Sequence, residues 1–399
     1  MNAPKLRFKE FNDEWQKISL KNVFEYFSTN SLSREHLFDI GIIKNIHYGD
    51  IHRKYSSIVD VENEVETYIK DINYNNKYEY CKDSDLIFAD ASEDYEGIGK
   101  VIELDNIKCN TVSGLHTILA RDKQNVFAPM FKGYYFNSPS IHNQIRVLAN
   151  GFKVYGISKD SIDKLNVNIP EKKEQSKIAR TLYLLDKKIE LQSQKIEDLK
   201  LFKKGLIKDF YNEYNLRKIK IKEIGKIVTG TTPSKSINSY WDNGNITWVT
   251  PTDINNSRDI NDSFFKITDK GLNKGKFIPK NSVLVTCIAS IGKNAILKVD
   301  GSCNQQINAI IPNKNFNYNY VYYLIESISN YMKSIAGTSA TSIINKEEFS
   351  KIIVKVHSKE KQDYIASVLS QFEIKILLEI SKLNKFYQLK KGLMQNMFV

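Results

Sequence analysis

The chain has 399 residues, of which 41% are hydrophobic and 11% aromatic, so it is long enough for two globular domains, each with a core of its own. The 58 Lys and Arg residues outnumber the 46 Asp and Glu residues, and the formal net charge of +12 favours polyanionic partners. No run of about 18 apolar residues could span a bilayer, and the opening MNAPKLRFKEF lacks the apolar core of a signal peptide. We therefore expect a cytoplasmic protein without a membrane partner.

Residues 1–155 are predicted to form a mainly-β domain with strand-like runs such as DLIFAD (85–90) between polar turns. Residues 156–215 follow as a helical region. In this region a strand-like LNVNIP ends at Pro170, and apolar residues then recur at gaps of 4, 3, 4, 7, 3, 7 and 4, which is a heptad seam with polar interruptions at Gln192 and Lys203. The seam consists of Ile178, Leu182, Leu185, Ile189, Ile196, Leu199, Leu206 and Phe210.

Residues 216–341 are predicted to form a second mainly-β domain, with the runs ITWVT (246–250), SVLVTCIA (282–289) and INAIIP (307–312). Residues 342–399 form a second helical region whose seam is interrupted at Glu379 and Lys390. This second seam consists of Ile365, Leu369, Phe372, Ile376, Leu383, Phe386, Leu393 and Met397.

The chain contains an internal repeat. Gln175 and Gln362 lie 187 positions apart, and at the same offset Lys203-Lys204-Gly205-Leu206 matches Lys390-Lys391-Gly392-Leu393. Earlier segments match more loosely, because WQKISLKNVF (15–24) resembles LRKIKIKEIG (216–225) at an offset of 201. Each half therefore combines a variable domain with a constant helical block.

The repeat and the connection between the halves predict how the helices pair. One such seam alone fits an amphipathic helix buried against its own domain, but two matching seams favour pairing with each other. Only NEYN (212–215) separates the first helix from the second domain, so the second helix must run back along the first. The result is an antiparallel coiled coil with a domain at each end. A helix from Ile178 to Phe210 is roughly 50 Å long, whereas one turn of B-DNA is roughly 34 Å, so the pair could act as a ruler along DNA.

This organisation resembles the specificity subunit of type I restriction-modification systems over essentially the whole chain. The motifs that carry the resemblance are TGTTPSKSINSYWDNGNITWVTPTDI (229–254) and the helix start IPEKKEQSKIARTLYLLDKKI (169–189) with its counterpart IASVLSQFEIKI (365–376). The first domain departs from the TGxTPS pattern and shows only FSTNSLSREH and KNIHYGDI there. Such a difference is expected where two domains read different half-sites.

The resemblance implies an α+β specificity subunit without catalytic activity. Its two target recognition domains each read half of a bipartite, asymmetric double-stranded DNA site, while the helices set the gap and dock two modification subunits. S-adenosylmethionine, ATP and Mg would be bound by the modification and restriction subunits. The sequence agrees, since it has no GxxxxGK[ST] loop and no Asn/Asp-Pro-Pro-aromatic motif. The four cysteines form no CxxC pair and the six histidines show no ligand spacing, so no metal is expected.

Base edges are read mainly by Arg, Lys, Asn and Gln, and phosphates are bound by cations and hydroxyls, so polar loop residues are the candidate DNA contacts. In the second domain the candidates are Thr232, Ser234, Lys235, Tyr240, Asn304, Gln305 and Gln306. In the first domain they are Arg34, His52, Arg53, Lys54, Ser113 and His116. The alternative for the Asn-rich turns is turn chemistry alone. Trp241 and Trp248 are predicted to be core residues.

Two further interpretations stay open at the level of sequence. A stand-alone regulator could grip a bipartite operator without partner subunits, or a coiled-coil scaffold could carry two protein-binding domains. Gly205 and Gly392 interrupt the helical segments, and because an interior glycine costs about 1 kcal/mol, we predict that they allow close packing at each helix end.

Overall fold

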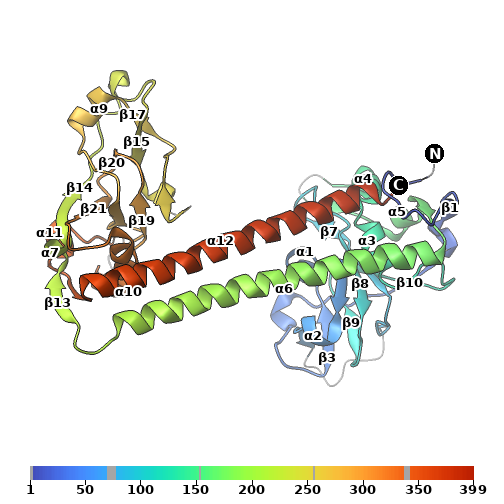
Figure 1. Ribbon diagram of the computed structural model, residues 1–399. Helices are drawn as coiled ribbons and strands as arrows, with labels where there is room; N and C mark the ends of the chain where they lie inside the picture. Colours follow the sequence, from blue (N-terminus) through green and yellow to red (C-terminus); the bar gives the residue numbers. More distant parts are fainter. Residues whose placement is uncertain (1–2, 70–77, 152–153, 255–256, 337–341) are drawn as a thin grey trace. The chain divides into compact units, whose positions relative to one another are not determined.

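The computed structural model describes residues 3–69, 78–151, 154–254, 257–336 and 342–399 (Figure 1). The chain divides into two compact units, one made of Met1–Ser193 with Ser381–Val399 and the other of Gln194–Ile380. Each unit contains one globular domain and part of each of two long helices, α6 (Lys172–Tyr211) and α12 (Lys359–Asn396). The predicted α+β fold class is confirmed.

The globular domain of unit one is built on two sheets. The larger sheet has the order β2 (Phe24–Phe27), β10 (Thr117–Asp122), β6 (Leu86–Ala89), β8 (Val101–Asp105) and β4 (Ile58–Asp60). The smaller sheet has the order β5 (Tyr68–Ile69), β3 (Ile43–Ile46) and β9 (Thr111–Ser113). The helices are η1 (Leu20–Asn22), η2 (Arg34–His36), α1 (Tyr48–Arg53), α2 (Val61–Glu64), α3 (Phe131–Phe136), α4 (Pro139–Leu148) and α5 (Lys159–Asp163).

The globular domain of unit two repeats this strand order. Its larger sheet has the order β14 (Gly225–Thr229), β21 (Ile307–Pro312), β18 (Ser282–Thr286), β19 (Asn294–Leu297) and β16 (Asp259–Ile260). Its smaller sheet has the order β17 (Lys266–Ile267), β15 (Ile246–Val249) and β20 (Gly301–Cys303). The helices are α7 (Ile221–Ile224), η3 (Asn238–Tyr240), α8 (Pro251–Ile254), α9 (Asp269–Lys274), α10 (Tyr318–Ile335) and α11 (Lys346–Lys351).

The duplication extends to strand direction. In each larger sheet one pair is parallel, β4 with β8 and β16 with β19, and in each smaller sheet the parallel pairs are β3 with β9 and β15 with β20. These pairs occupy the same places in the two strand orders. The internal repeat therefore covers the variable domains, where the sequences match only loosely.

Each helical region contains a strand before its long helix, and the first of these strands lies at the predicted strand-like LNVNIP. β12 (Asn166–Ile169) lies inside the predicted region 156–215, yet it pairs antiparallel with β1 (Gln16–Ser19). β22 (Ile353–Val356) lies inside the predicted region 342–399 and pairs with β13 (Arg217–Lys220) in the same way. The strands pair because they bury alternate side chains against the domains, so the helices begin only at Lys172 and Lys359. The predicted boundary at residue 341 lies outside the described residues.

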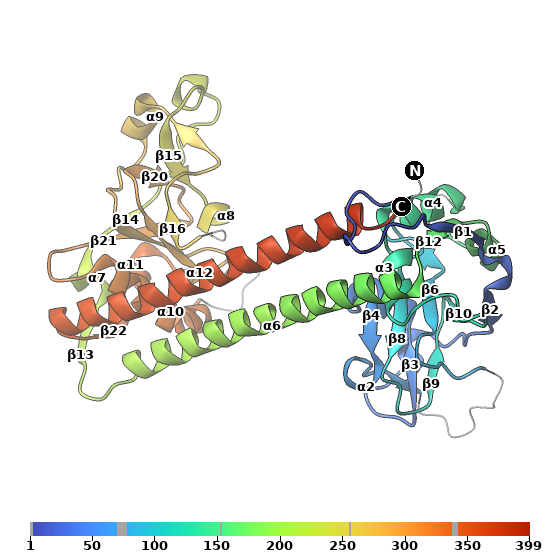
Figure 2. The ribbon, with the colours of Figure 1, turned by 45° about the vertical axis from the view of Figure 1, so that its right-hand side comes forward.

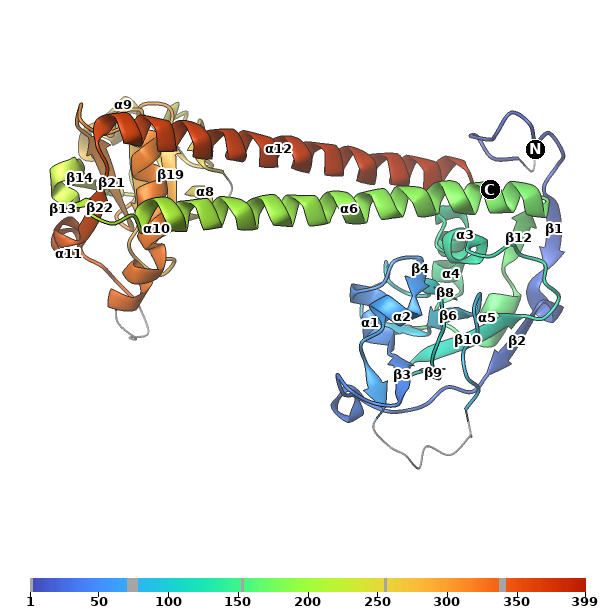
Figure 3. The ribbon, with the colours of Figure 1, turned by 60° about the horizontal axis from the view of Figure 1, so that its bottom comes forward.

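Each domain core contains a helix that lies between the larger sheet and the long helices. In unit one this helix is α3, FKGYYF, whose six residues are all buried and which lies beneath α6 in Figure 3. A Cβ atom at Gly133 would lie 2.3 Å from the carbonyl oxygen of Ser57, so only glycine allows this close approach. α4 and the two-stranded pair of β7 (Ala91–Ser92) and β11 (Tyr155–Gly156) complete this unit.

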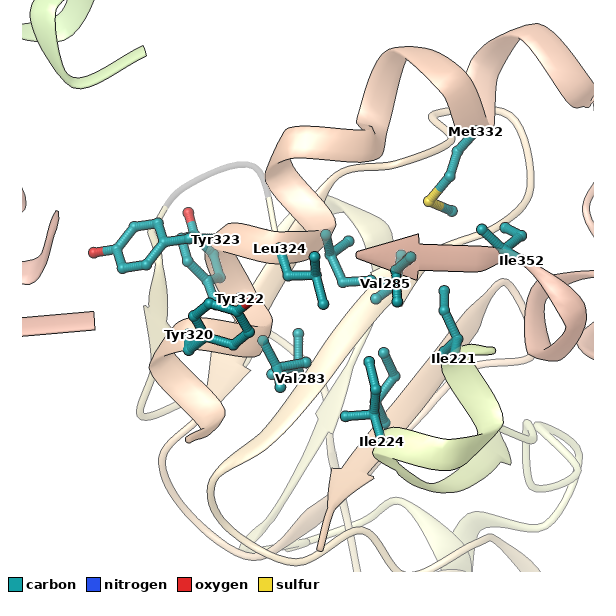
Figure 4. Close-up of a cluster of buried hydrophobic side chains, with 14 of the residues drawn as sticks. Ile221, Ile224, Val283, Val285, Tyr320, Tyr322, Tyr323, Leu324, Met332 and Ile352 are labelled. Atoms are coloured by element: carbon teal, nitrogen blue, oxygen red, sulfur yellow. The ribbon is translucent and has the colours of Figure 1, made fainter. Parts of the chain in front are cut away.

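In unit two the corresponding helix is α10, which packs on β18 and β19 and lies next to α12 (Figure 2). Figure 4 shows Tyr320 and Leu324 of α10 directed toward Val283 and Val285 of β18. All five residues of β18 are buried, which explains its continuous apolar run.

The long helices pair antiparallel in both units. In unit one, Lys188 Nζ lies 4.8 Å from the centre of the Phe386 ring. In unit two, the rings of Phe202 and Phe372 are 5.3 Å apart, and Lys195 Nζ lies 2.9 Å from Glu379 Oε1. Residue numbers rise along one helix as they fall along the other, so the predicted antiparallel orientation is confirmed.

The residues of the predicted heptad seams divide into two sets, one packed in the domain cores and one lying between the two long helices. Residues in the first turns of each helix lie in a domain core beside the end of the other helix. These are Ile178 and Leu182 with Met397, and Ile365 and Leu369 with Ile207. The middle of the seam is less covered, because Leu185, Ile189, Ile196 and Ile376 are buried whereas Leu199, Phe372, Leu383 and Phe386 are partly exposed. Packing against a domain and packing between the helices therefore both contribute.

The prediction for the two helix glycines is wrong. Gly205 and Gly392 lie inside α6 and α12, and a Cβ atom at either position would meet nothing within 4 Å. The glycines permit no close approach of another segment.

Among the described residues, no helix combines the length and apolar character that crossing a membrane requires.

Candidate nucleic-acid interface

Loops at one end of the sheets of unit two converge on a hollow of about 380 Å³. The loops follow β14, β15, β18 and β20, and they are separate in sequence. The lining residues are Thr232, Lys235, Trp248, Thr250, Pro251, Thr252, Phe265, Ile288, Ala289, Ser290, Asn304, Gln305 and Gln306. The strand order of the domain therefore brings polar and apolar side chains of four distant loops together, and Phe265 joins them from the segment before β17.

Backbone hydrogen bonds fix the loops around this hollow. The Thr231 N–H donates to the Cys303 carbonyl at 2.9 Å, and the Asn304 N–H donates to the Val249 carbonyl at 3.0 Å. A Cβ atom at Gly230 would lie 2.2 Å from the Asn304 carbonyl oxygen, so the glycine of the TGTTPS motif is needed for this approach.

The prediction of two core tryptophans is confirmed for Trp248, whereas Trp241 is partly exposed. Trp248 is 3% exposed and its Nε1–H donates to the Thr231 carbonyl at 3.1 Å. Trp241 packs edge-to-face on it, with ring centres 5.0 Å apart. The indoles support the loop that carries the candidate contacts.

Five of the seven candidate contacts of unit two line the hollow. Thr232, Lys235 and Gln305 are exposed, Gln306 is half-buried, and Asn304 is buried with its side-chain amide bonded to Gln306. Asn304 is thus also a turn residue, which was the alternative considered for these amides. Ser234, which bonds Ser236, and Tyr240, in η3, do not line the hollow. Contact of any of the seven with DNA stays a prediction.

In unit one the corresponding loops carry a different set of side chains. The Tyr48 ring lies 4.6 Å from the His47 ring and 5.2 Å from the His116 ring. His116 Nδ1 lies 3.3 Å from Asp90 Oδ1, and His52 Nε2 lies 2.9 Å from the Ala91 carbonyl oxygen. Burial lowers the pKa of His47, which outweighs the opposing effect of the nearby Asp50 carboxylate, and the positive charge of Arg34 lowers it further. We therefore expect His47 to be neutral at pH 7.

Arg34 is held by an acid. Its Nη1–H donates to Asp50 Oδ2 at 2.5 Å, and the Arg34 side chain is 58% exposed whereas the Asp50 side chain is 12% exposed. The hydrogen bond to Asp50 raises the pKa of Arg34. The Arg34 side chain is therefore exposed and held by a hydrogen bond at one nitrogen, Nη1.

The other candidates of unit one are placed less favourably for a shared surface. Arg53 is exposed at the end of α1. Lys54 pairs with Glu66 at 2.7 Å and lines a different cleft, which borders α6. Ser113 is 2% exposed and its hydroxyl shares a hydrogen bond of 2.7 Å with that of Thr117, so in this structure it cannot present a free donor.

Several residues of these loops in the two units were missed by the sequence predictions. His47 and Tyr48 follow β3, and Thr250 and Pro251 follow β15, so the pair HYGDI and TPTDI marks equivalent positions. An alignment of these two motifs would have indicated the equivalent positions from the sequence. Phe265 and Ala289 had none, because they come from segments whose proximity depends on the strand order.

The helical parts contain two clefts at equivalent positions of the repeat. In unit two, a cleft of about 1530 Å³ lies between the end of α6, α10, β22 and α12, and exposed Leu201, Phe202 and Leu377 line it beside Lys200 and Lys204. In unit one, the cleft measures about 420 Å³ and is more polar. Its lining includes Asp60, Glu64, Asp105, Tyr134, Asp186, Glu190, Tyr387 and Lys390.

Each cleft contains a lysine from the polar interruptions of the seam. Lys203 Nζ lies 2.6 Å from Glu373 Oε2 and 3.4 Å from Glu326 Oε1. Lys390 Nζ lies 2.6 Å from Asp186 Oδ1, and the Tyr134 hydroxyl donates to the same carboxylate. The two lysines that interrupt the apolar seam thus form ion pairs between the helices.

Among the described residues, no group of three or more His, Cys, Asp or Glu could hold a metal ion.

Two domains of the same strand order, with different polar loops and an antiparallel helix pair, define a duplicated α+β fold. The chain belongs to the family described as type I restriction modification DNA specificity domain, whose model matches residues 12–201 and again residues 214–386. The two matches correspond to the two halves of the repeat.

Curated relatives agree with this membership. The MjaIX specificity subunit of Methanocaldococcus jannaschii is 36% identical over 160 residues, which cover 39% of this chain and 37% of that protein. The EcoR124I/EcoR124II specificity subunit of Escherichia coli is 30% identical over 241 residues, covering 54% and 57%. The HindI specificity subunit of Haemophilus influenzae is 22% identical over 433 residues, covering 87% and 90%. The chain thus spans about a third to nine tenths of these relatives.

Solved structures show the same fold. The S subunit of a type I system from M. genitalium superposes with a TM-score of 0.61 at 14% identity, covering 100% of this chain and 99% of that chain. The HsdS subunit from Thermoanaerobacter tengcongensis superposes with a TM-score of 0.51 at 14% identity, covering 96% of each chain.

Proposed function

We propose that this chain is the DNA sequence-specificity subunit of a type I restriction-modification complex. Each globular domain reads one half of a bipartite, asymmetric double-stranded DNA site, and the helix pair sets the gap between the halves. The observation that carries this proposal is the twofold match of the specificity-domain family to two domains that share a strand order but differ in their loops. The stand-alone regulator and the protein-binding scaffold have no comparable support.

The partners follow from this role. Two modification subunits dock on the helical regions, and restriction subunits join the complex. Exposed Leu201 and Leu377, at 70% and 60%, line the cleft of unit two and offer apolar area that a partner could cover. Lysines on its rim favour an acidic partner segment.

The chain itself is proposed to be non-catalytic and to bind no cofactor. S-adenosylmethionine, ATP and Mg belong to the partner subunits, and the complex works in the cytoplasm. The hollow of unit two supports this view, because its polar groups are hydroxyls, amides and one lysine, without a carboxylate or imidazole for acid–base chemistry.

The test is to express the chain with its cognate modification subunit and to map N6-methyladenine in the host DNA. We expect one interrupted, non-palindromic motif that disappears when this chain is omitted. Methylation that persists without the chain, or a motif without a gap, would contradict the proposal.

Docking is tested by Leu201→Glu combined with Leu377→Glu. The two charges should abolish co-purification of a modification subunit, because a buried carboxylate would lose its water without gaining a partner. Tyr214→Glu is the control, since Tyr214 is 95% exposed outside the helices. Unchanged co-purification of the double variant would exclude this cleft as the docking site.

A further inference from the structure

Arg34 and Lys235 occupy equivalent places in the two domains. Ser113 ends β9 and Cys303 ends β20, and the carbonyls of these two residues accept the N–H groups of Asn30 at 3.2 Å and Thr231 at 2.9 Å, respectively. Arg34 lies four residues after Asn30, and Lys235 lies four residues after Thr231. By this count Arg34 is the counterpart of Lys235, which lines the hollow of unit two, and its hydrogen bond to Asp50 of α1 places it beside the loop that follows β3.

The two cations differ in how they are held. Among the described residues, Lys235 has neither an ion pair nor a side-chain hydrogen bond, so its ammonium group is a mobile point charge. Arg34 is bound through Nη1 alone, and within the described part of the chain its other four N–H donors have no partner. A guanidinium that is anchored at one nitrogen and free along its other edges can form two parallel hydrogen bonds.

Asp50 supplies the anchor because it is fixed itself. It lies in the first turn of α1, where its backbone N–H donates to the His47 carbonyl at 2.9 Å. Its side chain is mostly buried, whereas more than half of the Arg34 side chain is exposed. The pairing removes much of the rotamer freedom that a free arginine would lose on binding.

We propose that Arg34 reads a guanine in the first half-site through a bidentate contact to O6 and N7, and that Asp50 is its positioning residue. This inference rests on the proposed function and adds the residue and the base to it. Arginine is the usual partner of the guanine edge in the major groove, and a fixed orientation makes the contact selective. Lys235, at the equivalent place, contributes charge without such selectivity, so the two half-sites are read by different chemistry at matched positions.

The experiment measures binding of the complex of this chain with its modification subunit to its methylated motif and to duplexes with one substituted base pair. For wild type we expect one guanine of the first half-site whose substitution weakens binding strongly. Arg34→Gln should reduce that single discrimination ratio by roughly 10- to 100-fold and leave the ratios of the second half-site unchanged. Asp50→Asn should lower the ratio at the same base pair, and Arg34→Lys, which keeps the charge, should lower it as well.

Lys17→Gln is the control, since it removes one exposed cation of unit one that lies in β1, outside the candidate interface and the long helices. Melting temperatures identify any variant that does not fold, and the 58% exposure of Arg34 predicts that its variants fold. An equal loss of affinity for all duplexes in Arg34→Gln would mean a phosphate contact and would overturn the proposal, as would unchanged ratios at every position. A wild-type complex that shows no bipartite preference would instead overturn the proposed function.

Discussion

Glycines at two kinds of position have opposite effects on stability, and the structure separates them. Gly230 lies where the loop after β14 crosses the loop after β20, and a Cβ atom there would meet the backbone. Gly205 lies in α6, where a Cβ atom would meet nothing. The same residue type is therefore required at one position and merely tolerated at the other.

We predict that Gly230→Ala lowers the free energy of unfolding by about 1–3 kcal/mol, because the backbone of two loops would have to shift. Gly205→Ala should raise helix stability by about 1 kcal/mol, since alanine loses less conformational freedom in a helix. Thermal unfolding of the purified chain with either substitution measures both effects. A stable Gly230→Ala chain would mean that the two loops approach less closely than described here.

Lys203 affects the stability of unit two through the two carboxylates beside it, Glu326 and Glu373. Burial raises the pKa of Glu326, and Lys203 counteracts this shift. A carboxyl group with a raised folded-state pKa destabilises the fold once the pH exceeds that pKa, because the charged form is then buried. Without the lysine, the charges of Glu326 and Glu373 would repel each other in the same cleft.

We therefore predict that Lys203→Met destabilises unit two by about 1–3 kcal/mol at pH 8, and by less at pH 5, where Glu326 can accept a proton. The partial exposure of the three groups, 11% to 37%, keeps the expected effect below that of a fully buried pair. Unfolding in urea at the two pH values gives the comparison, with Lys200→Met as an exposed control. A deficit that grows as the pH falls would contradict the assigned sign.

At the scale of elements, the helix seam combines two roles that its period alone cannot distinguish. Leu369 and Ile376 are both apolar heptad positions, yet Leu369 lies in the core of the unit-two domain whereas Ile376 lines the open cleft beside α6. The period depends only on which face of a helix is covered. What covers that face is decided by the domain at each helix end.

This division predicts unequal costs of truncation along the seam. Leu369→Ala removes a side chain with no exposed surface from a domain core and should cost about 2–5 kcal/mol. Leu383→Ala truncates a partly exposed side chain and should cost clearly less. Urea unfolding of both variants checks the order, and a reversed order would show that the helix contacts dominate stability.

At the scale of the whole molecule, the proposed function makes the helix length a measure of the DNA gap. One heptad inserted into the middle of both α6 and α12 keeps the antiparallel seam in phase and lengthens the pair by about 10 Å. That length corresponds to roughly three base pairs. We expect the methylated motif to keep both half-sites and to widen its gap by about this amount. Methylome sequencing measures the gap directly. An unchanged gap would mean that the length of the helices does not set the spacing of the two half-sites.

Exchange of residues 216–341 for the corresponding segment of another family member tests modularity. The strand order shows that this domain forms its own sheets, with β22 as its one strand outside that range. One half of the methylated motif should change while the other half stays. Alteration of both halves would mean that the domains do not read DNA independently.

The sequence by itself determined the architecture of this protein. The 187-residue repeat, the heptad seam and the short NEYN connection established two duplicated halves and an antiparallel helix pair, because periodicity and connectivity are local or additive properties of a chain. It also named Lys235 and Gln305 as candidate DNA contacts from the composition of their turns, and both line the hollow of unit two, while their contact with DNA stays a prediction.

Only the tertiary structure decided which polar groups meet. Arg34 and Asp50 lie 16 residues apart, and the loops of the hollow come from four segments, so their proximity depends on the strand order and on the parallel pairs β3–β9 and β15–β20. The two domains have different sequences in these loops. Neither the hydrophobic period nor the residue spacing of a loop indicates which other segments lie beside it in the fold. The free energy that positions Arg34 comes from a contact between segments, which a linear sequence does not display.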